Sequence, residues 1–294
     1  MKKSDIPSAS YKAIKLPEPK YIVSEDNHKY SIVLPTGETI GPLKSVTGII
    51  QVLNKPALIG WAAREAASYF KTELLRIGRT ALDPTMLEQI AKDAAQAHRR
   101  KAKDAATLGT ACHAIFEAII KGNEPRETPA ELIEPTLDFK RWRLSTDIEI
   151  IATELAVASR EHRYGGRVDA IGWSESRGGF GVVDFKTSSG FFGSEYAFQV
   201  GGYAQALSEM YGVELKWAEI VRFGKKPPYD SEGRPVRDLP LAITGFLNAA
   251  AMVLSNETPL IGEPDFCTKV VRAEEAATAA KTATPKSKKA AFPF

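Results

Sequence analysis

The feature that most constrains the fold is a change of hydrophobic period near residue 148. Beyond it, three runs rich in apolar and β-branched residues follow one another: IEIIATELAVAS, GGRVDAIGW and GFGVVDFKTS. Clusters of turn-forming residues separate these runs at 161–165 and 174–179. Short runs bounded in this way are typical of consecutive strands, and tight turns between them favour antiparallel pairing. This part of the chain is therefore expected to form a β-sheet.

Helical patterns surround the sheet-forming segment. Pro56 begins a strongly helical stretch. Residues 84–121 predict two further helices, with Gly109 near their junction and Gly122 after the last apolar residue. The other expected elements are a β-hairpin or meander over 20–43, a helix over 194–212, a strand over 214–223, a loop or hairpin tip over 224–235 and a helix over 239–256. This order predicts an α/β fold with one central mixed sheet flanked by helices.

Composition divides the chain into one domain and two terminal segments. A chain of 294 residues is long enough to bury a large core. Residues 1–19 are polar and contain prolines, which predicts a flexible lead-in. Residues 271–294 are rich in Ala and Lys and have almost nothing to bury, which predicts a disordered tail. The expected domain spans 20–270, with the hairpin and first helices in 20–122 and the sheet with its helices in 123–270.

Net charge alone does not indicate a nucleic-acid partner, because the formal surplus of +3 lies in 271–294 and leaves 1–270 neutral.

No apolar run reaches the ~18–20 residues that span a bilayer, and no apolar stretch follows the lysines at the start, as it would in a secretory signal. The only two cysteines, Cys112 and Cys267, exclude a four-cysteine zinc or iron–sulfur site. We expect a cytoplasmic protein with no membrane partner. A disulfide between Cys112 and Cys267 is disfavoured in the reducing cytosol.

The candidate chemistry lies in two of the predicted strands. Asp169 occurs in GGRVDAIGW, Asp184 follows in GVVDFKTS, and Lys186 comes two residues later. Residues i and i+2 of a strand point to the same face, so Asp184 and Lys186 share one face. Antiparallel pairing would bring Asp169 beside Asp184, and two close carboxylates repel each other unless a cation lies between them. Carboxylate oxygens suit Mg²⁺ or Mn²⁺, and a nearby lysine can stabilise the charge of a phosphoryl-transfer transition state.

The alternative is that these charged residues are surface groups on half-exposed strands. Their neighbours Val168, Val182 and Val183 are apolar, which places the acids in buried strands where an isolated charge is costly. This pattern favours a functional site over a solvated surface.

Two helical pairs accompany the acids. His113 and Glu117 are four residues apart and share a helix face, as do Gln199 and Tyr203. Taken alone, a helical histidine is ordinarily structural, and the Gln–Tyr pair is ordinary for a helix. A dense basic run, with Arg99, Arg100, Lys101 and Lys103, has two interpretations: a solvated helix face, or a helix that follows a phosphate backbone.

Four ordered motifs carry a family resemblance. GTACHAIFE, GGRVDAI, VVDFKTS and QVGGYAQAL together resemble the PD-(D/E)XK nuclease superfamily, in particular its RecB-like exonuclease branch. The earlier segment SVTGIIQVLNKPALIGWAA is similar to phage-type exonucleases and to relatives of the mitochondrial genome maintenance exonuclease. The matches cover about residues 45–207. One departure from the pattern is Val168, where the superfamily name has a proline before the first acid.

The resemblance implies a role for each matched residue. It implies that His113, Asp169, Asp184 and the Phe185 carbonyl hold Mg²⁺ or Mn²⁺, and that Lys186 is the catalytic lysine. Gln199 and Tyr203 match a helix that positions the scissile strand, and Glu117 and Glu154 match accessory acidic positions. The basic residues Arg99, Arg100, Lys101 and Lys103 then become candidates for DNA binding.

The fold implied is a restriction-endonuclease-like core with an N-terminal helical arch. The function implied is a divalent-metal-dependent DNA exonuclease of phage or prophage recombination or replication, with a single-strand annealing or binding protein as a natural partner. One alternative is a structure-specific endonuclease of the same fold. Another is a non-catalytic DNA-binding or adaptor protein, which the intact acid and lysine set disfavours.

Overall fold

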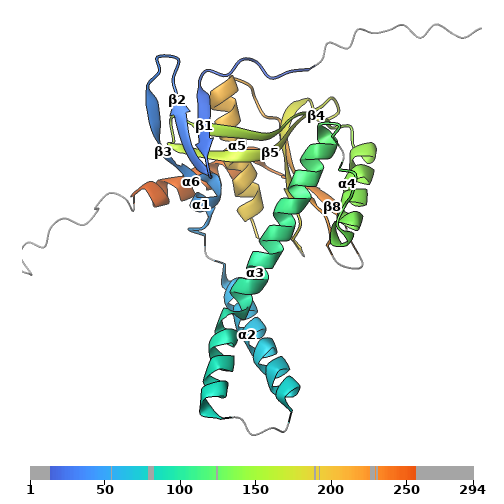
Figure 1. Cartoon of the computed structure of the whole chain (residues 1–294). Coiled ribbons are helices and arrows are strands. Elements are labelled where there is room, and N and C mark those ends of the chain that lie inside the picture. Colours follow the sequence, from blue (N-terminus) through green and yellow to red (C-terminus); the bar gives the residue numbers. More distant parts are fainter. Residues whose placement is uncertain are drawn as a thin grey trace, which may run out of the picture. The chain divides into compact units, whose positions relative to one another are not determined.

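The structure is a computed structural model that describes residues 14–53, 55–78, 83–123, 125–188, 190–191, 193–225, 229 and 231–255. The expected tail over 271–294, Cys267 and most of the expected lead-in lie outside the described residues. The described residues up to Ala251 form one compact unit. It is a mixed α/β fold in which helices flank a central sheet (Figure 1).

The described strands belong to one mixed sheet. They are β1 (Ile22–Asp26), β2 (Lys29–Val33), β3 (Thr39–Ser45), β4 (Glu149–Ser159), β5 (Tyr164–Ser174), β6 (Gly179–Lys186), β7 (Trp217–Arg222) and β8 (Glu232–Pro235). The order is β1-β2-β3-β5-β6-β7-β8, and β4 pairs with β5. The pairs β3·β5 and β6·β7 are parallel and the others are antiparallel. The predicted meander and the antiparallel strands after residue 148 are therefore confirmed.

The sheet opens along one edge of β5. There, β3 pairs only with Tyr164 and Gly165, whereas β6 pairs only from Ala170 onward. The β5 residues between these two segments, which include Asp169, are bordered by neither strand. The opening therefore leaves an acidic residue of a buried strand accessible to side chains from other elements.

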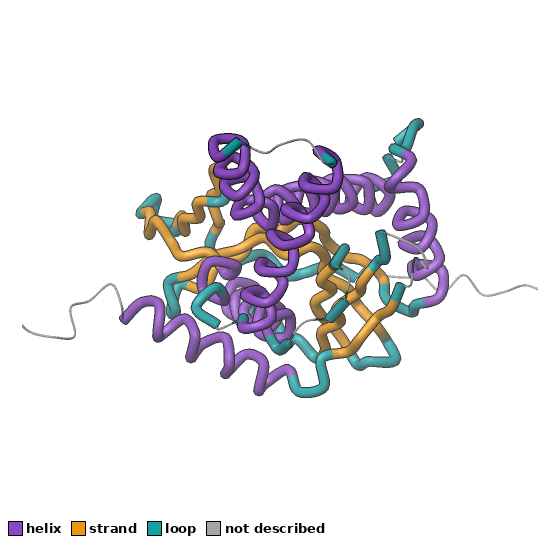
Figure 2. The backbone as a smooth tube through the Cα atoms, turned by 90° about the horizontal axis from the view of Figure 1, so that it is seen from below, coloured by secondary structure: helices purple, strands orange, loops and turns teal. Residues whose placement is uncertain are grey.

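Helices lie on both faces of this sheet (Figure 2), whereas α2 packs on α3. They are α1 (Val46–Ile50), α2 (Pro56–Ile77), α3 (Pro84–Ile120), the 3₁₀ turn η1 (Ala130–Leu132), α4 (Ile133–Ser145), α5 (Glu195–Tyr211) and α6 (Leu239–Ser255). None of them combines the length and apolar character that a membrane span requires. The predicted helices from Pro56, over 194–212 and over 239–256 are confirmed within the described residues.

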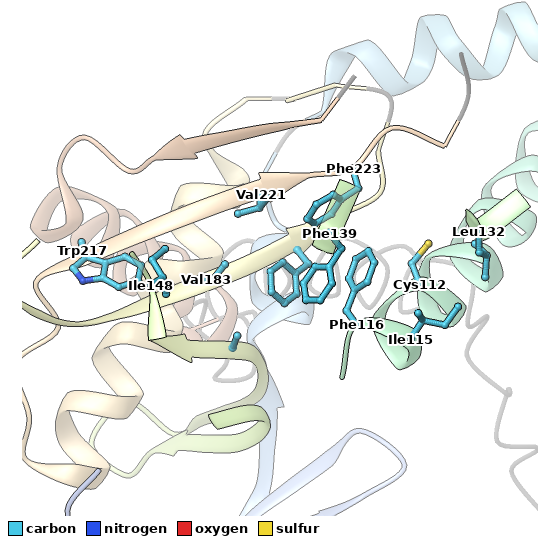
Figure 3. Close-up of a cluster of buried hydrophobic side chains, with 12 residues drawn as sticks. Cys112, Ile115, Phe116, Leu132, Phe139, Ile148, Val183, Trp217, Val221 and Phe223 are labelled. Atoms are coloured by element: carbon cyan, nitrogen blue, oxygen red, sulfur yellow. The ribbon is translucent and has the colours of Figure 1, made fainter. Parts of the chain in front are cut away.

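An aromatic core joins the end of α3 and α4 to one face of the sheet (Figure 3). The rings of Phe116 and Phe139 stack with centroids 4.3 Å apart, and both meet Phe185 of β6 and Phe223 edge-on. Cys112 is a free thiol buried in the same core, where burial raises its pKa to about 11. This packing fixes the position of the residue that follows Cys112 on α3, which is His113.

The opposite face is covered by α5, and α6 packs on α5 at close range. A Cβ atom on Gly201 would lie 2.5 Å from the Ala242 backbone, and one on Gly202 would lie 2.8 Å from the Phe246 ring. Glycine at these positions lets the two helices approach, and this holds α5 in place against the sheet.

The prediction of two helices over 84–121 is wrong, because α3 is one continuous helix from Pro84 to Ile120. Gly109 lies inside it and breaks nothing, since a single helical glycine costs only about 1 kcal/mol. The glycine instead serves close packing, because a Cβ atom there would lie 3.1 Å from the Thr187 hydroxyl. The first half of α3 packs along α2 (Figure 1). Both helices precede the strands β4 to β8 in the chain, where the sequence predicts helices.

Candidate active site

Three acidic residues come together on adjacent strands. The β4·β5 register pairs Thr153 with Ala170 and Leu155 with Val168, so Glu154 lies opposite Asp169. The β5·β6 register pairs Ala170 with Val183, which places Asp184 at the next position on β6. Laterally aligned strand residues point to the same face, so the three carboxylates share one side of the sheet.

A histidine from α3 completes a group of possible metal ligands. His113 Nδ1 lies 3.5 Å from Asp169 Oδ1 and 4.0 Å from Glu154 Oε1. One ligand atom from each of these three residues lies within 4.8 Å of the others. The structure thus brings His113 to Asp169, as the sequence predicts, and Glu154, predicted as an accessory, lies in the same group. Asp184 lies outside this group of described residues.

Asp184 and Lys186 form the second half of the site. Lys186 Nζ lies 2.5 Å from Asp184 Oδ2 and donates a hydrogen bond to Gln199 Oε1 at 3.1 Å. Gln199 Nε2 donates in turn to the Tyr203 hydroxyl, also at 3.1 Å. The predicted pairs on β6 and α5 therefore form one connected polar network beside the acids.

Burial and like charge raise two carboxyl pKa values in the site. Burial and the negative charge of Asp169 raise the pKa of Glu154 to about 7. Burial raises the pKa of Asp184 to about 6, against the opposing effect of the Lys186 ammonium. Each shift has the sign expected when carboxylates converge in an apolar environment with too little positive charge to balance them.

Opposite charges dominate at three other groups. Burial raises the pKa of Asp169, but the His113 ring, the Lys186 charge and a hydrogen bond from the Phe185 N–H at 2.8 Å outweigh it, so this pKa is lowered. Burial lowers the pKa values of His113 and Lys186, but the neighbouring carboxylates outweigh it and both are raised. Lys186 is therefore an ammonium group at neutral pH.

The donor set and its surroundings fit a hard divalent cation. Imidazole and carboxylate are ligands that Mn²⁺ accepts, and carboxylates suit Mg²⁺. Asp184 Oδ1 is fully buried and meets no hydrogen-bond donor among the described residues. A buried carboxylate oxygen without a donor is costly, and a cation would remove that cost.

The backbone holds Glu154 in an unusual conformation. Its φ of 51° lies in the left-handed region, which non-glycine residues rarely adopt. Its carbonyl accepts a hydrogen bond of 2.8 Å from Arg167, whose guanidinium also pairs with Glu25 of β1. Backbone strain of this kind persists where the surrounding structure enforces it, which is common at functional sites.

The predicted DNA-binding residues of α3 do not reach the acids. At 1.5 Å per helical residue, Lys103 lies about 15 Å from His113 along the axis, and Arg99 lies about 21 Å away. Arg100 lies 4.9 Å from the Tyr69 ring centroid and Lys101 pairs with Glu65, both on α2. Arg99 bonds Gln96 on its own helix, and residues 101–107 are exposed on every side. Part of the basic run therefore holds the helical pair together.

The two remaining predicted residues take different places. Glu117, one turn after His113, pairs with Lys121 at the helix surface, and its charge contributes to the raised pKa of Glu154. The Phe185 ring packs in the aromatic core on the opposite face, while its N–H donates to Asp169.

Sequence reasoning missed several contributors to the site. Tyr196 lies beneath Lys186, with Nζ 5.2 Å from the ring centroid, and Thr153 donates a 2.7 Å hydrogen bond to the Asp169 carbonyl. Helix α4, which supplies Phe139 to the aromatic core, was also not predicted. The alternation of β4 could have placed Glu154 on the same face as Asp169, but only with the register known.

Comparisons with known proteins identify only distant likenesses. No family model and no curated protein matches the chain. Among solved structures, an alkaline exonuclease, LHK-Exo, from Laribacter hongkongensis has 17% identity and a TM-score of 0.31, covering 58% of this chain and 84% of that one. The structure of LHK-Exo in complex with dAMP has 15% identity and the same TM-score, covering 58% and 85%. Similarity at this level assigns neither a family nor a function to the chain.

Proposed function

We propose that this protein is a divalent-metal-dependent nuclease that hydrolyses DNA phosphodiester bonds, with a restriction-endonuclease-like core. The observation that carries the proposal is the convergence of Glu154, Asp169 and Asp184 on adjacent strands beside a buried lysine ammonium. A protein that only bound DNA would have no use for a costly cluster of buried acids, because phosphates repel carboxylates.

The proposed metal site uses His113, Glu154 and Asp169, with Asp184 at its border. A Mg²⁺ or Mn²⁺ ion bound there would act as a Lewis acid on the phosphodiester group. The hydrogen bond from the Phe185 N–H fixes one oxygen of Asp169, so that its other oxygen faces His113.

Lys186 has a different task in the proposed mechanism. Because its pKa is raised, it stays protonated and acts as a donor rather than as a base. Hydrolysis joins the oxygen of water to phosphorus and breaks one P–O ester bond, while negative charge grows on the phosphoryl oxygens. The ammonium, held by Asp184 and Gln199, is oriented to stabilise that charge. Tyr203 fixes the Gln199 amide.

We further propose that cleavage begins at DNA ends, as the motif resemblance implies. Digestion of end-labelled linear and covalently closed circular DNA, single- and double-stranded, tests this proposal with Mg²⁺, Mn²⁺ or EDTA. Metal-dependent loss of linear DNA only is the expected result, absent in Lys186→Ala and retained in the exposed control Lys216→Ala. Cleavage of circles would indicate an endonuclease. Binding of DNA without cleavage of any substrate would favour the non-catalytic alternative.

The proposal for the biological setting rests on the motif resemblance. We propose a role in phage or prophage recombination or replication, with a single-strand annealing or binding protein as partner. Co-purification of the full chain with a protein encoded beside it, tested with and without residues 271–294, would examine this proposal.

A further inference from the structure

A row of cations and aromatic rings continues from Lys186 across the sheet, away from the acids. We call it the cation–aromatic row: Lys186, Tyr196, Phe191, Arg222 and Arg234. Lys186 lies over Tyr196, and the guanidinium carbons of Arg222 and Arg234 lie 5.7 and 4.2 Å from the Phe191 ring centroid. The contacts of Phe191 with Arg222 and Arg234 involve none of the possible metal ligands.

Strand register places the three cations on one face. Lys186 of β6 is the Cα partner of Arg222 in the parallel β6·β7 pair, and Arg234 of β8 is the partner of Ile220, two residues before Arg222. Register partners and i, i+2 neighbours share a face, so all three side chains lie on the side of Asp184. With strands about 4.8 Å apart, the row extends about 10 Å beyond Lys186, the length of about three stacked nucleotides.

The charge at the end of the row is available to a ligand. Arg234 has a side chain 54% exposed, whereas Arg222 is buried. The ring of Phe191 supports the Arg234 guanidinium from one side, and the carboxylate of Glu232 bonds it at 2.6 and 3.1 Å. An exposed ion pair of this type is worth little in water, so a phosphate can replace the carboxylate. A planar guanidinium presents two donors to a phosphate.

We propose that Arg234 binds a backbone phosphate of a single DNA strand that leaves the reacting phosphodiester on the Lys186 side, and that Phe191 is its positioning residue. The proposal rests on the proposed function only in taking the acidic cluster as the point of cleavage. Glu232 then acts as a competitor that a phosphate displaces. Because Arg222 is buried, the strand meets the row at its exposed end, where Arg234 of β8 lies.

The test is the affinity of the full-length protein for a fluorescently labelled single-stranded oligonucleotide in EDTA, where no cleavage is required. Arg234→Gln is expected to weaken binding about tenfold, because a charge-assisted hydrogen bond is lost. It is also expected to reduce the slope of log affinity against log salt by about 0.7, the value for one phosphate contact on a single strand. Glu232→Gln is expected to strengthen binding, because it removes the competitor.

Two further variants separate positioning from folding. Phe191→Leu should lower affinity and the salt slope together, and Phe191→Tyr should restore both because the ring is kept. The matched control is Arg237→Gln, an exposed arginine near the opposite end of β7, which should leave affinity unchanged. Any of four results would overturn the inference. They are an equal loss of affinity in Arg234→Gln and Arg237→Gln, a salt slope unchanged by Arg234→Gln, weaker binding by Glu232→Gln, and no binding by the wild type. Normal binding without cleavage by the wild type would refute the proposed nuclease and leave this inference standing.

Discussion

Replacing Glu154 with Gln should stabilise the metal-free protein at alkaline pH while removing the proposed nuclease activity. The carboxyl has a pKa of about 7 in the folded protein against an ordinary value of 4.5, and its side chain is only 19% exposed. At about 1.4 kcal/mol per pH unit, ionising it in the folded state costs roughly 3 kcal/mol. Gln keeps the shape of the side chain and carries no charge.

The sign of the pH dependence follows from the direction of the shift. A carboxyl whose folded-state pKa is raised favours the folded state below its unfolded pKa, and this contribution is lost as pH rises from about 4.5 to about 7. The wild type should therefore lose stability over that window, and Glu154→Gln should lose less. The difference in unfolding free energy between Glu154→Gln and the wild type should widen by roughly 3 kcal/mol from about pH 4.5 to about pH 8. This corresponds to roughly 6–12 °C in Tm.

Urea unfolding in EDTA at both pH values measures this gap. The matched control is Glu149→Gln, an exposed glutamate at the start of the same strand, which should show no such widening. Metal-dependent cleavage by Glu154→Gln should fall below detection, since the group of possible ligands loses an oxygen anion. A gap that stays constant with pH, or one equally large in Glu149→Gln, would refute the electrostatic account of the site.

Three other predictions follow from the same geometry. Asp184→Asn should abolish cleavage without unfolding the protein, because it removes repulsion from Asp169; a loss of native circular dichroism would contradict this. Adding Mn²⁺ at 100 times its Kd should stabilise the wild type by about 2.7 kcal/mol but not His113→Ala, as thermal unfolding would report; equal stabilisation would exclude His113 as a ligand. Gly201→Ala should destabilise by roughly 1–3 kcal/mol, because its Cβ would meet the Ala242 backbone at 2.5 Å; an unchanged Tm would show that α6 moves freely on α5.

Local pattern is enough to predict the centre of the site. The alternation of β6 places Asp184 and Lys186 on one face whatever surrounds the strand, and the short turn after β5 makes the two strands antiparallel. The four-residue spacing of Gln199 and Tyr203 likewise places them together on any helix. These relations depend only on the periods of strand and helix, which the sequence itself contains.

Other features were decided by tertiary contacts. Gly109 resembles a break between helices, yet α3 continues because its turns pack on Thr187 and on the aromatic core. Glu154 joins the ligands because of the β4·β5 register and an arginine that holds its carbonyl, neither of which a single strand specifies.

The cation–aromatic row depends on tertiary structure most of all, since it joins a loop residue, Phe191, to two strands far along the chain. The sequence by itself determined which residues alternate on β6 and which share a turn of α5. The partners across β4, β5, β7 and β8 were decided by long-range pairing, because the energy of a register resides in contacts between segments rather than within them.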